Sequence, residues 1–256
     1  MLLVCLIWGT NFSVIKSAFP LMPPLAFTAV RFVISSALLW GLLRWREGPV
    51  VLPRGKRAAL VALGILGNTL YQVAFTVGLA HTEATNSSLI ISAVPTVVLA
   101  FGALLGIERP SGRMYAGVAL ATAGVALVVT AKGVAFERET LYGDFLSVLA
   151  MLCWAGYTLG VRRYLRGVSP LAVTALTTIT GTPGLVLVGA PQVLRLDWHA
   201  LTGAVWMALA YSSVLSLVVA YFIWNSSIQR VGSSRTAIYM CVTPLFAAAS
   251  AWVILG

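Results

Sequence analysis

The chain has 256 residues, of which 59% are hydrophobic and only 9% are charged, and its net charge is +10. A soluble domain carries about 25% charged residues, so this composition excludes a water-soluble globular protein. The basic excess does not indicate a nucleic-acid-binding protein, because the chain offers no basic domain that would hold a duplex.

Apolar stretches long enough to cross a bilayer recur along the chain. A hydrocarbon layer about 30 Å thick needs about 20 apolar residues per helix, and only helices satisfy the backbone within such a continuous run. The pattern therefore predicts an all-α integral membrane protein. The expected spans are nine, at residues 2–17, 25–43, 58–80, 85–106, 114–131, 141–161, 171–190, 201–224 and 236–256.

The charges between these spans predict an orientation. The first stretch lacks a basic region and a small-residue cleavage site, so it is interpreted as a span and not as a removable signal. With a cytoplasmic N-terminus, 12 of the 17 basic residues fall in inner loops, and the outer loops hold only Lys132, Arg138 and Arg195. This distribution follows the positive-inside rule. It predicts a multi-pass protein of the bacterial inner membrane whose partners are the lipid bilayer and a small-molecule solute.

Residues that would support catalysis or a metal site do not group in this sequence. Cys5, Cys153 and Cys241 fall inside predicted spans without metal-ligand spacing, and His81 and His199 lie far apart at outer ends. There is no phosphate-binding glycine loop and no Ser/His/Asp set. The sequence therefore predicts no metal, no cofactor and no enzymatic activity.

An internal repeat organises the chain. An offset of 146 residues pairs Trp8 with Trp154, Lys16 with Arg162 and Pro24 with Pro170. An offset of 149 pairs Pro95 with Pro244, and residues 84–90 with 233–239. Because each unit would hold five helices, an odd number, the second copy is expected upside down. The prediction is two inverted repeats, 1–131 and 141–256, with a binding site where they meet.

The same offsets predict that a tenth helix is missing. The counterpart of Glu108 would be position 257, one past the last residue of the sequence. The second unit is therefore expected to be truncated after four helices. The fifth helix, 114–131, is expected to be unusually exposed because its partner is absent.

Several motifs resemble the EamA-like group of the drug/metabolite transporter superfamily. They are WGTNF at residues 8–12 followed by Lys16, Arg31 with Phe32, GLAHTEATNSSLI at 78–90, Pro95, GIER at 106–109, and GSS at 232–234 followed by Pro244. The resemblance covers the whole chain and implies a ten-helix inverted-repeat fold that exports amino acids or other small metabolites. It also implies that the tenth helix packs beside the fifth, away from the central cavity.

Polar and aromatic residues recur at helical spacing in six spans, so each group shares one helix face. The proposed solute-lining residues are Trp8, Asn11, Tyr71, Gln72, Asn86, Trp154, Tyr157, Tyr221, Asn225 and Tyr239. The alternative is that they only hydrogen-bond neighbouring helices, each bond contributing about 0.6 to 2 kcal/mol. Stripes in six spans favour a common cavity.

Three further residues are candidates for charge recognition or gating. Arg31 lies well inside a span, where charge is costly enough to indicate function; the alternatives are snorkelling or pairing with carbonyls. Pro95 and Pro244 are expected mid-helix, each freeing a carbonyl one turn earlier. Equivalent kinks in both halves would suit alternating access, although static kinks are equally compatible.

Two functions are consistent with these patterns. One is a secondary transporter of small organic metabolites; the other is a non-transporting membrane scaffold with the same fold. A solute-sized polar cavity between the halves would distinguish the transporter. Its aromatic and amide lining, with Arg31 and Arg235 as the nearby charges, favours neutral or aromatic amino acids and disfavours quaternary cations.

Overall fold

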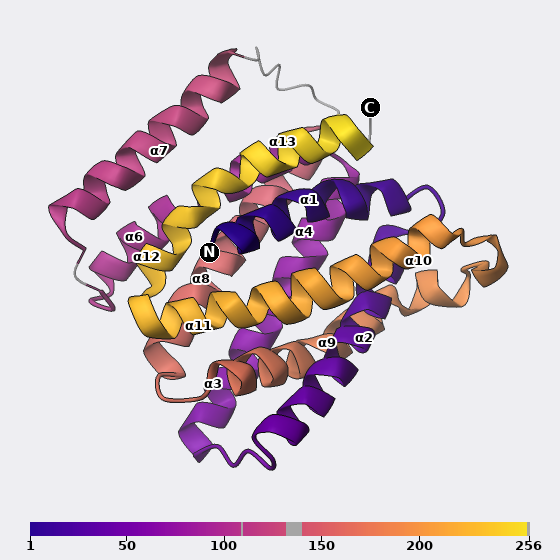
Figure 1. Ribbon diagram of the computed structural model, residues 1–256, viewed down its shortest axis with the longest axis horizontal. Helices are drawn as coiled ribbons and strands as arrows, with labels where there is room; N and C mark the ends of the chain where they lie inside the picture. Colours follow the sequence, from indigo (N-terminus) through magenta and orange to yellow (C-terminus); the bar gives the residue numbers. More distant parts are fainter. Residues whose placement is uncertain (109, 132–139, 255–256) are drawn as a thin grey trace.

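The computed structural model describes residues 1–108, 110–131 and 140–254, and its regular elements there are all helical (Figure 1). Arg109, Lys132 and Arg138, which entered the topology prediction, lie outside the described residues, as do residues 255–256. The elements are α1 Leu2–Ala18, α2 Pro24–Arg46, α3 Arg54–Gly64, η1 Ile65–Leu70, α4 Tyr71–Ala80, α5 Ala84–Ile91, α6 Val94–Leu104, α7 Gly112–Ala131, α8 Leu141–Tyr164, α9 Pro170–Leu194, η2 Trp198–Ala200, α10 Gly203–Ala210, η3 Tyr211–Ala220, α11 Tyr221–Val231, α12 Ser233–Ala237, η4 Ile238–Val242 and α13 Thr243–Ile254.

The helices match the predicted apolar stretches. Within the described residues, seven continuous helical stretches are long and apolar enough to cross a bilayer, and Leu2–Ala18 is a shorter apolar helix. The 20-residue helix α7 occupies the predicted fifth stretch. The prediction of an all-α, multi-pass membrane protein is confirmed.

Four of the spans are irregular at matching places in the two halves. The third and eighth contain π-helical segments, η1 and η3, and π segments are frequent at functional sites. The fourth breaks at Ser92 and Ala93, and the ninth passes through the 3-10 segment η4. Pro95 and Pro244 were expected mid-helix, but they lie in the first turns of α6 and α13. Proline lacks an N–H, so it is tolerated where a helix begins.

Glycines allow close contacts between these helices. A Cβ at Gly67 in η1 would lie 2.3 Å from the Tyr157 ring, and one at Gly160 would lie 2.3 Å from Leu63. Gly156 likewise faces Leu66, so Gly156 and Gly160 both lie where α8 packs closely on the third span. Gly106 has a φ of 63° and open space where a Cβ would lie, and it follows the end of α6, where glycine readily adopts this conformation.

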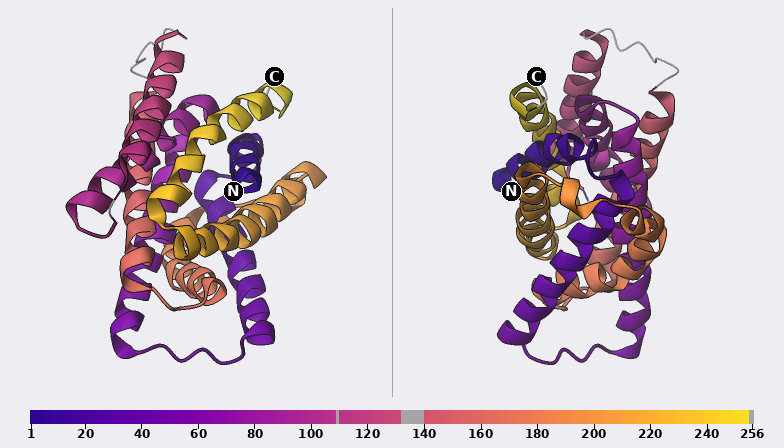
Figure 2. Two further views of the ribbon diagram at one scale, coloured as in Figure 1. Left: turned by 60° about the vertical axis from the view of Figure 1, so that its left-hand side comes forward. Right: turned by 90° about the vertical axis from the view of Figure 1, so that its right-hand side faces the viewer.

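Helix α7 lies along the outside of the molecule (Figures 1 and 2). It contacts α6 and η4, and most of its described side chains are exposed, with Val118 buried. The prediction that this helix is exposed is confirmed for those side chains. The remaining helices enclose a centre in which α1 packs on α13 and α2 packs on α9.

Candidate solute site

An aromatic cluster occupies the centre of the helices. Trp8 of α1 and Trp154 of α8 meet edge to face with ring centroids 5.5 Å apart. Tyr221 lies 5.8 Å from Trp8 and 5.2 Å from Trp154, and Tyr71 lies 5.0 Å from Trp154. Tyr157 stacks on Trp154 at 5.1 Å. The structure therefore brings together five of the predicted aromatic residues from four separate spans.

A small cavity adjoins this cluster. Its volume is about 20 Å³, and its lining includes the predicted residues Trp8, Asn11, Arg31, Tyr71, Gln72 and Tyr221. Such a space holds about one water molecule. The expectation of a solute-sized cavity is not met in this conformation, because aromatic side chains from both halves fill the space.

Arg31 is buried in this lining, with 1% of its surface exposed. One guanidinium nitrogen, Nη2, donates to Oε1 of Gln72 at 2.5 Å, and Gln72 donates to the hydroxyl of Tyr221 at 2.9 Å. The buried Nε has no hydrogen-bond partner among the described residues. Arg31 therefore does not snorkel. It is a buried cation whose described polar neighbours are neutral groups, and such a cation favours an anionic partner.

The side-chain amides of two other predicted residues form hydrogen bonds between helices. Asn11 accepts from the hydroxyl of Ser212 at 2.7 Å. Asn225 accepts from Tyr157 at 3.1 Å and donates to Thr174 at 3.0 Å. Asn11 also lines the cavity, whereas Asn225 does not.

Three further predicted positions lie outside both the aromatic cluster and the central cavity. Asn86 is half-buried on α5. The next residue, Ser87, forms the hydrogen bond to α8. Tyr239 is 40% exposed and lines a different pocket together with Arg235. Neither residue lines the central cavity. The 3-10 segment η4 has three residues per turn, so Tyr239 lies on a different face from the one that α-helical spacing predicts.

The lining also contains residues that the sequence did not single out. They include Ile91, which lies beside the break in the fourth span, Ser216 within η3 and Met240 within η4. The carbonyl of Ser216 accepts from the indole nitrogen of Trp8 at 3.2 Å. A regular period of 3.6 residues does not project these positions inward, so the pattern contained no signal for them.

Several contacts join residues separated by the repeat offsets themselves. Trp8 touches Trp154 and Ser36 hydrogen-bonds Thr182 at 2.7 Å, both at an offset of 146. Gln72 hydrogen-bonds Tyr221 at 2.9 Å, and the Cys241 thiol lies 4.0 Å from the Ser92 carbonyl, both at an offset of 149. In two halves related by a two-fold rotation, a residue touches its own counterpart only near the axis.

Hydrogen bonds from α1 and α8 hold the junction between α4 and α5. Lys16 of α1 donates to the carbonyl of Thr82, just beyond the C-terminus of α4. The Thr82 hydroxyl donates to Asp144 of α8 at 2.6 Å. A cation is favourable at a helix C-terminus, so Lys16 stabilises this junction.

The corresponding junction in the second half, between α11 and α12, has matching contacts. Arg162 donates to the carbonyls of Ile228 and Gln229 at 3.4 and 3.2 Å. Glu108 accepts from the backbone and hydroxyl of Ser233 and from the backbone of Ser234. Burial raises the pKa of Glu108, but these hydrogen bonds outweigh it and the pKa is lowered overall.

Fold and site together define a multi-pass helical membrane protein with a closed, polar and aromatic centre. The model of the EamA-like transporter family matches residues 1–130 and 141–256, so the chain belongs to this family of membrane transporters.

Curated relatives agree with this assignment. An uncharacterized transporter of Archaeoglobus fulgidus is 30% identical over 99% of this chain and 87% of its own length. A probable amino-acid metabolite efflux pump of Salmonella typhimurium is 25% identical over 100% of this chain and 85% of its own length. A solved crystal structure with 19% identity shares the fold with a TM-score of 0.76 over 98% of this chain and 85% of that one.

Proposed function

We propose that this transporter moves small amphipathic metabolites with a carboxylate, neutral or aromatic amino acids in particular, across a bacterial inner membrane. The observation that carries the proposal is Arg31, a buried guanidinium with an unpartnered Nε at the edge of an aromatic cluster. Guanidinium pairs with carboxylate through charge-assisted hydrogen bonds. Aromatic side chains beside it offer edge or face contacts of about 0.5 to 1.5 kcal/mol per pair.

The relatives support the solute class. Besides the Salmonella protein, an Escherichia coli protein named a probable amino-acid metabolite efflux pump is 26% identical over 99% of this chain. A bulky quaternary cation, in contrast, would meet Arg31 as a like charge. We therefore expect such cations to be poor solutes.

Alternating access between inverted repeats is the proposed mechanism. The contacts at offsets of 146 and 149 support a two-fold axis through the centre. The two junctions support two gates, because each is held by a cation of its own half and a carboxylate of the other. Release of one junction would open the centre toward one side while the other stays closed.

A non-transporting scaffold is the second candidate, and the 20 Å³ cavity favours it. Under the transport proposal this conformation is occluded, and solute enters only after the aromatic cluster separates. The scaffold would keep the cluster packed permanently.

Flux through reconstituted vesicles separates the two. The solutes are labelled leucine and phenylalanine, the corresponding amines without a carboxylate, and tetraphenylphosphonium as a bulky permanent cation. We expect saturable flux of the amino acids and little flux of the amines or the cation. Absence of flux for every solute with folded protein supports the scaffold; flux of the cation equal to that of the amino acids refutes the proposed solute class.

A further inference from the structure

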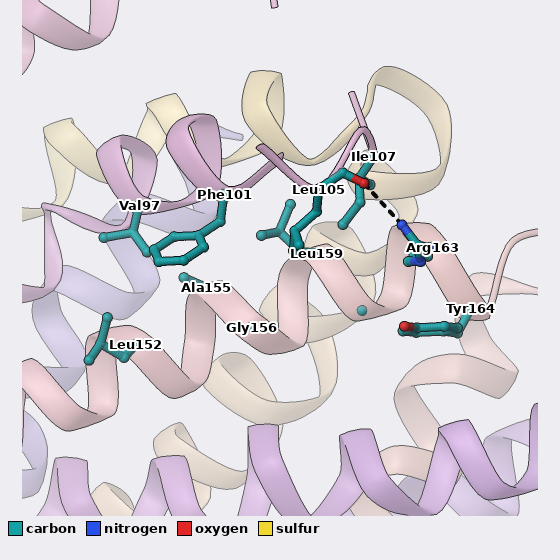
Figure 3. A pocket seen from close by; sticks show the side chains of 11 residues that line it. Val97, Phe101, Leu105, Ile107, Leu152, Ala155, Gly156, Leu159, Arg163 and Tyr164 are labelled. Carbon is teal, nitrogen blue, oxygen red and sulfur yellow. Dashed lines mark hydrogen bonds between the residues drawn. The ribbon is translucent and has the colours of Figure 1, made fainter. Parts of the chain in front are cut away.

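A groove lies away from the central site, between α6 and α8. Its volume is about 460 Å³, and its walls are apolar side chains such as Val97, Phe101, Leu152 and Leu159 (Figure 3). This size is in the range of sites for small ligands, about 300 to 1,000 Å³. Water would be unfavourable along these walls, and both helices belong to membrane spans.

The groove has the length of one leaflet. It follows α8 from Leu152, near the middle of the span, to Tyr164 at its end. At a rise of about 1.5 Å per residue this is roughly 18 Å. Half of a hydrocarbon layer about 30 Å thick is roughly 15 Å, so the groove matches one acyl chain lying along the helix.

The groove ends at a cation. Arg163 is exposed, and its Nη1 donates to the carbonyl of Leu105 at 3.1 Å, which holds the side chain across the end of the groove (Figure 3). A guanidinium has five N–H donors and binds phosphate in a bidentate manner. The next residue, Tyr164, is 54% exposed. Tyrosine is enriched at the depth of the lipid headgroups, so its position agrees with a headgroup at this end of the groove.

We infer that this groove binds an anionic phospholipid, with an acyl chain between α6 and α8 and its phosphate on Arg163. The apolar length and the match to one leaflet favour an acyl chain, and the cation at the headgroup end favours an anionic headgroup. This site is independent of the proposed transport function.

Native mass spectrometry of the full chain in detergent tests the inference. The probes are phosphatidylglycerol and phosphatidylcholine with identical acyl chains, and glycerol 3-phosphate as a headgroup without tails. We expect one tightly held phosphatidylglycerol per chain, retained about tenfold better than phosphatidylcholine, and no displacement by glycerol 3-phosphate.

Three variants locate the site. Arg163→Gln should reduce phosphatidylglycerol retention to the level of phosphatidylcholine. The matched control Arg166→Gln, an exposed arginine at the same end that does not line the groove, should not. Val97→Phe narrows the groove and should reduce both lipids.

Three results would overturn the inference. The first is equal retention of the two lipids by the unmodified protein, a comparison that needs no variant to fold. The second is an equal effect of the two arginine substitutions, which would indicate diffuse attraction to the basic end. The third is a lipid-free dimer that Val97→Phe abolishes, which would assign the groove to a second copy of the chain.

Discussion

At the scale of single residues, a buried arginine distinguishes this centre from ordinary helix packing. Phe27 and Phe32 place their rings 5.7 and 5.8 Å from the Arg31 guanidinium, and Gln72 occupies one of its donors. An unpaired cation inside a membrane is costly, so its retention favours a role in binding.

Replacement of Arg31 tests that role. In vesicles, Arg31→Gln should lower amino-acid flux at least tenfold, which corresponds to about 1.4 kcal/mol of binding free energy. Arg31→Lys keeps the charge but loses the planar guanidinium geometry, so its flux should lie between those of the unmodified protein and Arg31→Gln. Flux of the matching amine should change little in either variant. Equal loss for amine and amino acid, with protein that elutes as the unmodified chain, would contradict carboxylate recognition.

A second prediction at this scale concerns pH and Glu108. Its folded pKa is lowered, so the ionised carboxylate favours the folded state. The stabilisation is present above the unfolded pKa, about 4.3, and is lost as pH falls through the lower folded pKa. Thermal unfolding from pH 7 to pH 3 should show the unmodified protein more stable than Glu108→Gln at pH 7, with the difference shrinking below about pH 4. A difference that is constant across this range would contradict the capping role.

At the scale of elements, the π-helical segment η1 depends on a glycine. A Cβ at Gly67 would lie 2.3 to 2.9 Å from Tyr157 atoms, and the ring cannot retreat because it stacks on Trp154. The two helices therefore approach as closely as backbone allows, which sets the position of Tyr71 and Gln72 one turn later.

Gly67→Ala should accordingly destabilise the protein by about 1 to 3 kcal/mol through overpacking. The matched control is Gly41→Ala in α2, where a Cβ meets nothing within 4 Å; it should be neutral or stabilising by up to about 1 kcal/mol. Thermal unfolding in detergent measures both. If the two substitutions have the same effect, the close contact at Gly67 is not limiting.

At the scale of the whole molecule, weakening either of the two junctions should open the centre toward opposite sides of the membrane. Asp144→Asn weakens the contact at Thr82, and Glu108→Gln weakens the contacts at Ser233 and Ser234. If they are two gates of one alternating cycle, each substitution should favour opening toward its own side.

Cysteine labelling measures this response. The three native cysteines are replaced, and a reporter cysteine is introduced at Ser216 in the cavity lining. A membrane-impermeant maleimide then labels this cysteine from one side or the other of oriented vesicles. Asp144→Asn should increase labelling from one side and Glu108→Gln from the other. An increase from the same side in both variants would refute paired gates, whatever the solute.

The helical class, the positions of the spans and most of the central residues could be predicted from composition and periodicity. Low charge and long apolar runs leave a bilayer as the only favourable surroundings, and helical spacing projects Trp8, Tyr71, Gln72 and Trp154 inward wherever the helix is regular. Tertiary structure decided what periodicity does not encode. The π and 3-10 segments changed the residues per turn, so Ser216 and Met240 joined the lining and Tyr239 left it. The size of the central cavity and the groove beside α8 were likewise decided only in three dimensions, because both depend on how far packed helices stand apart.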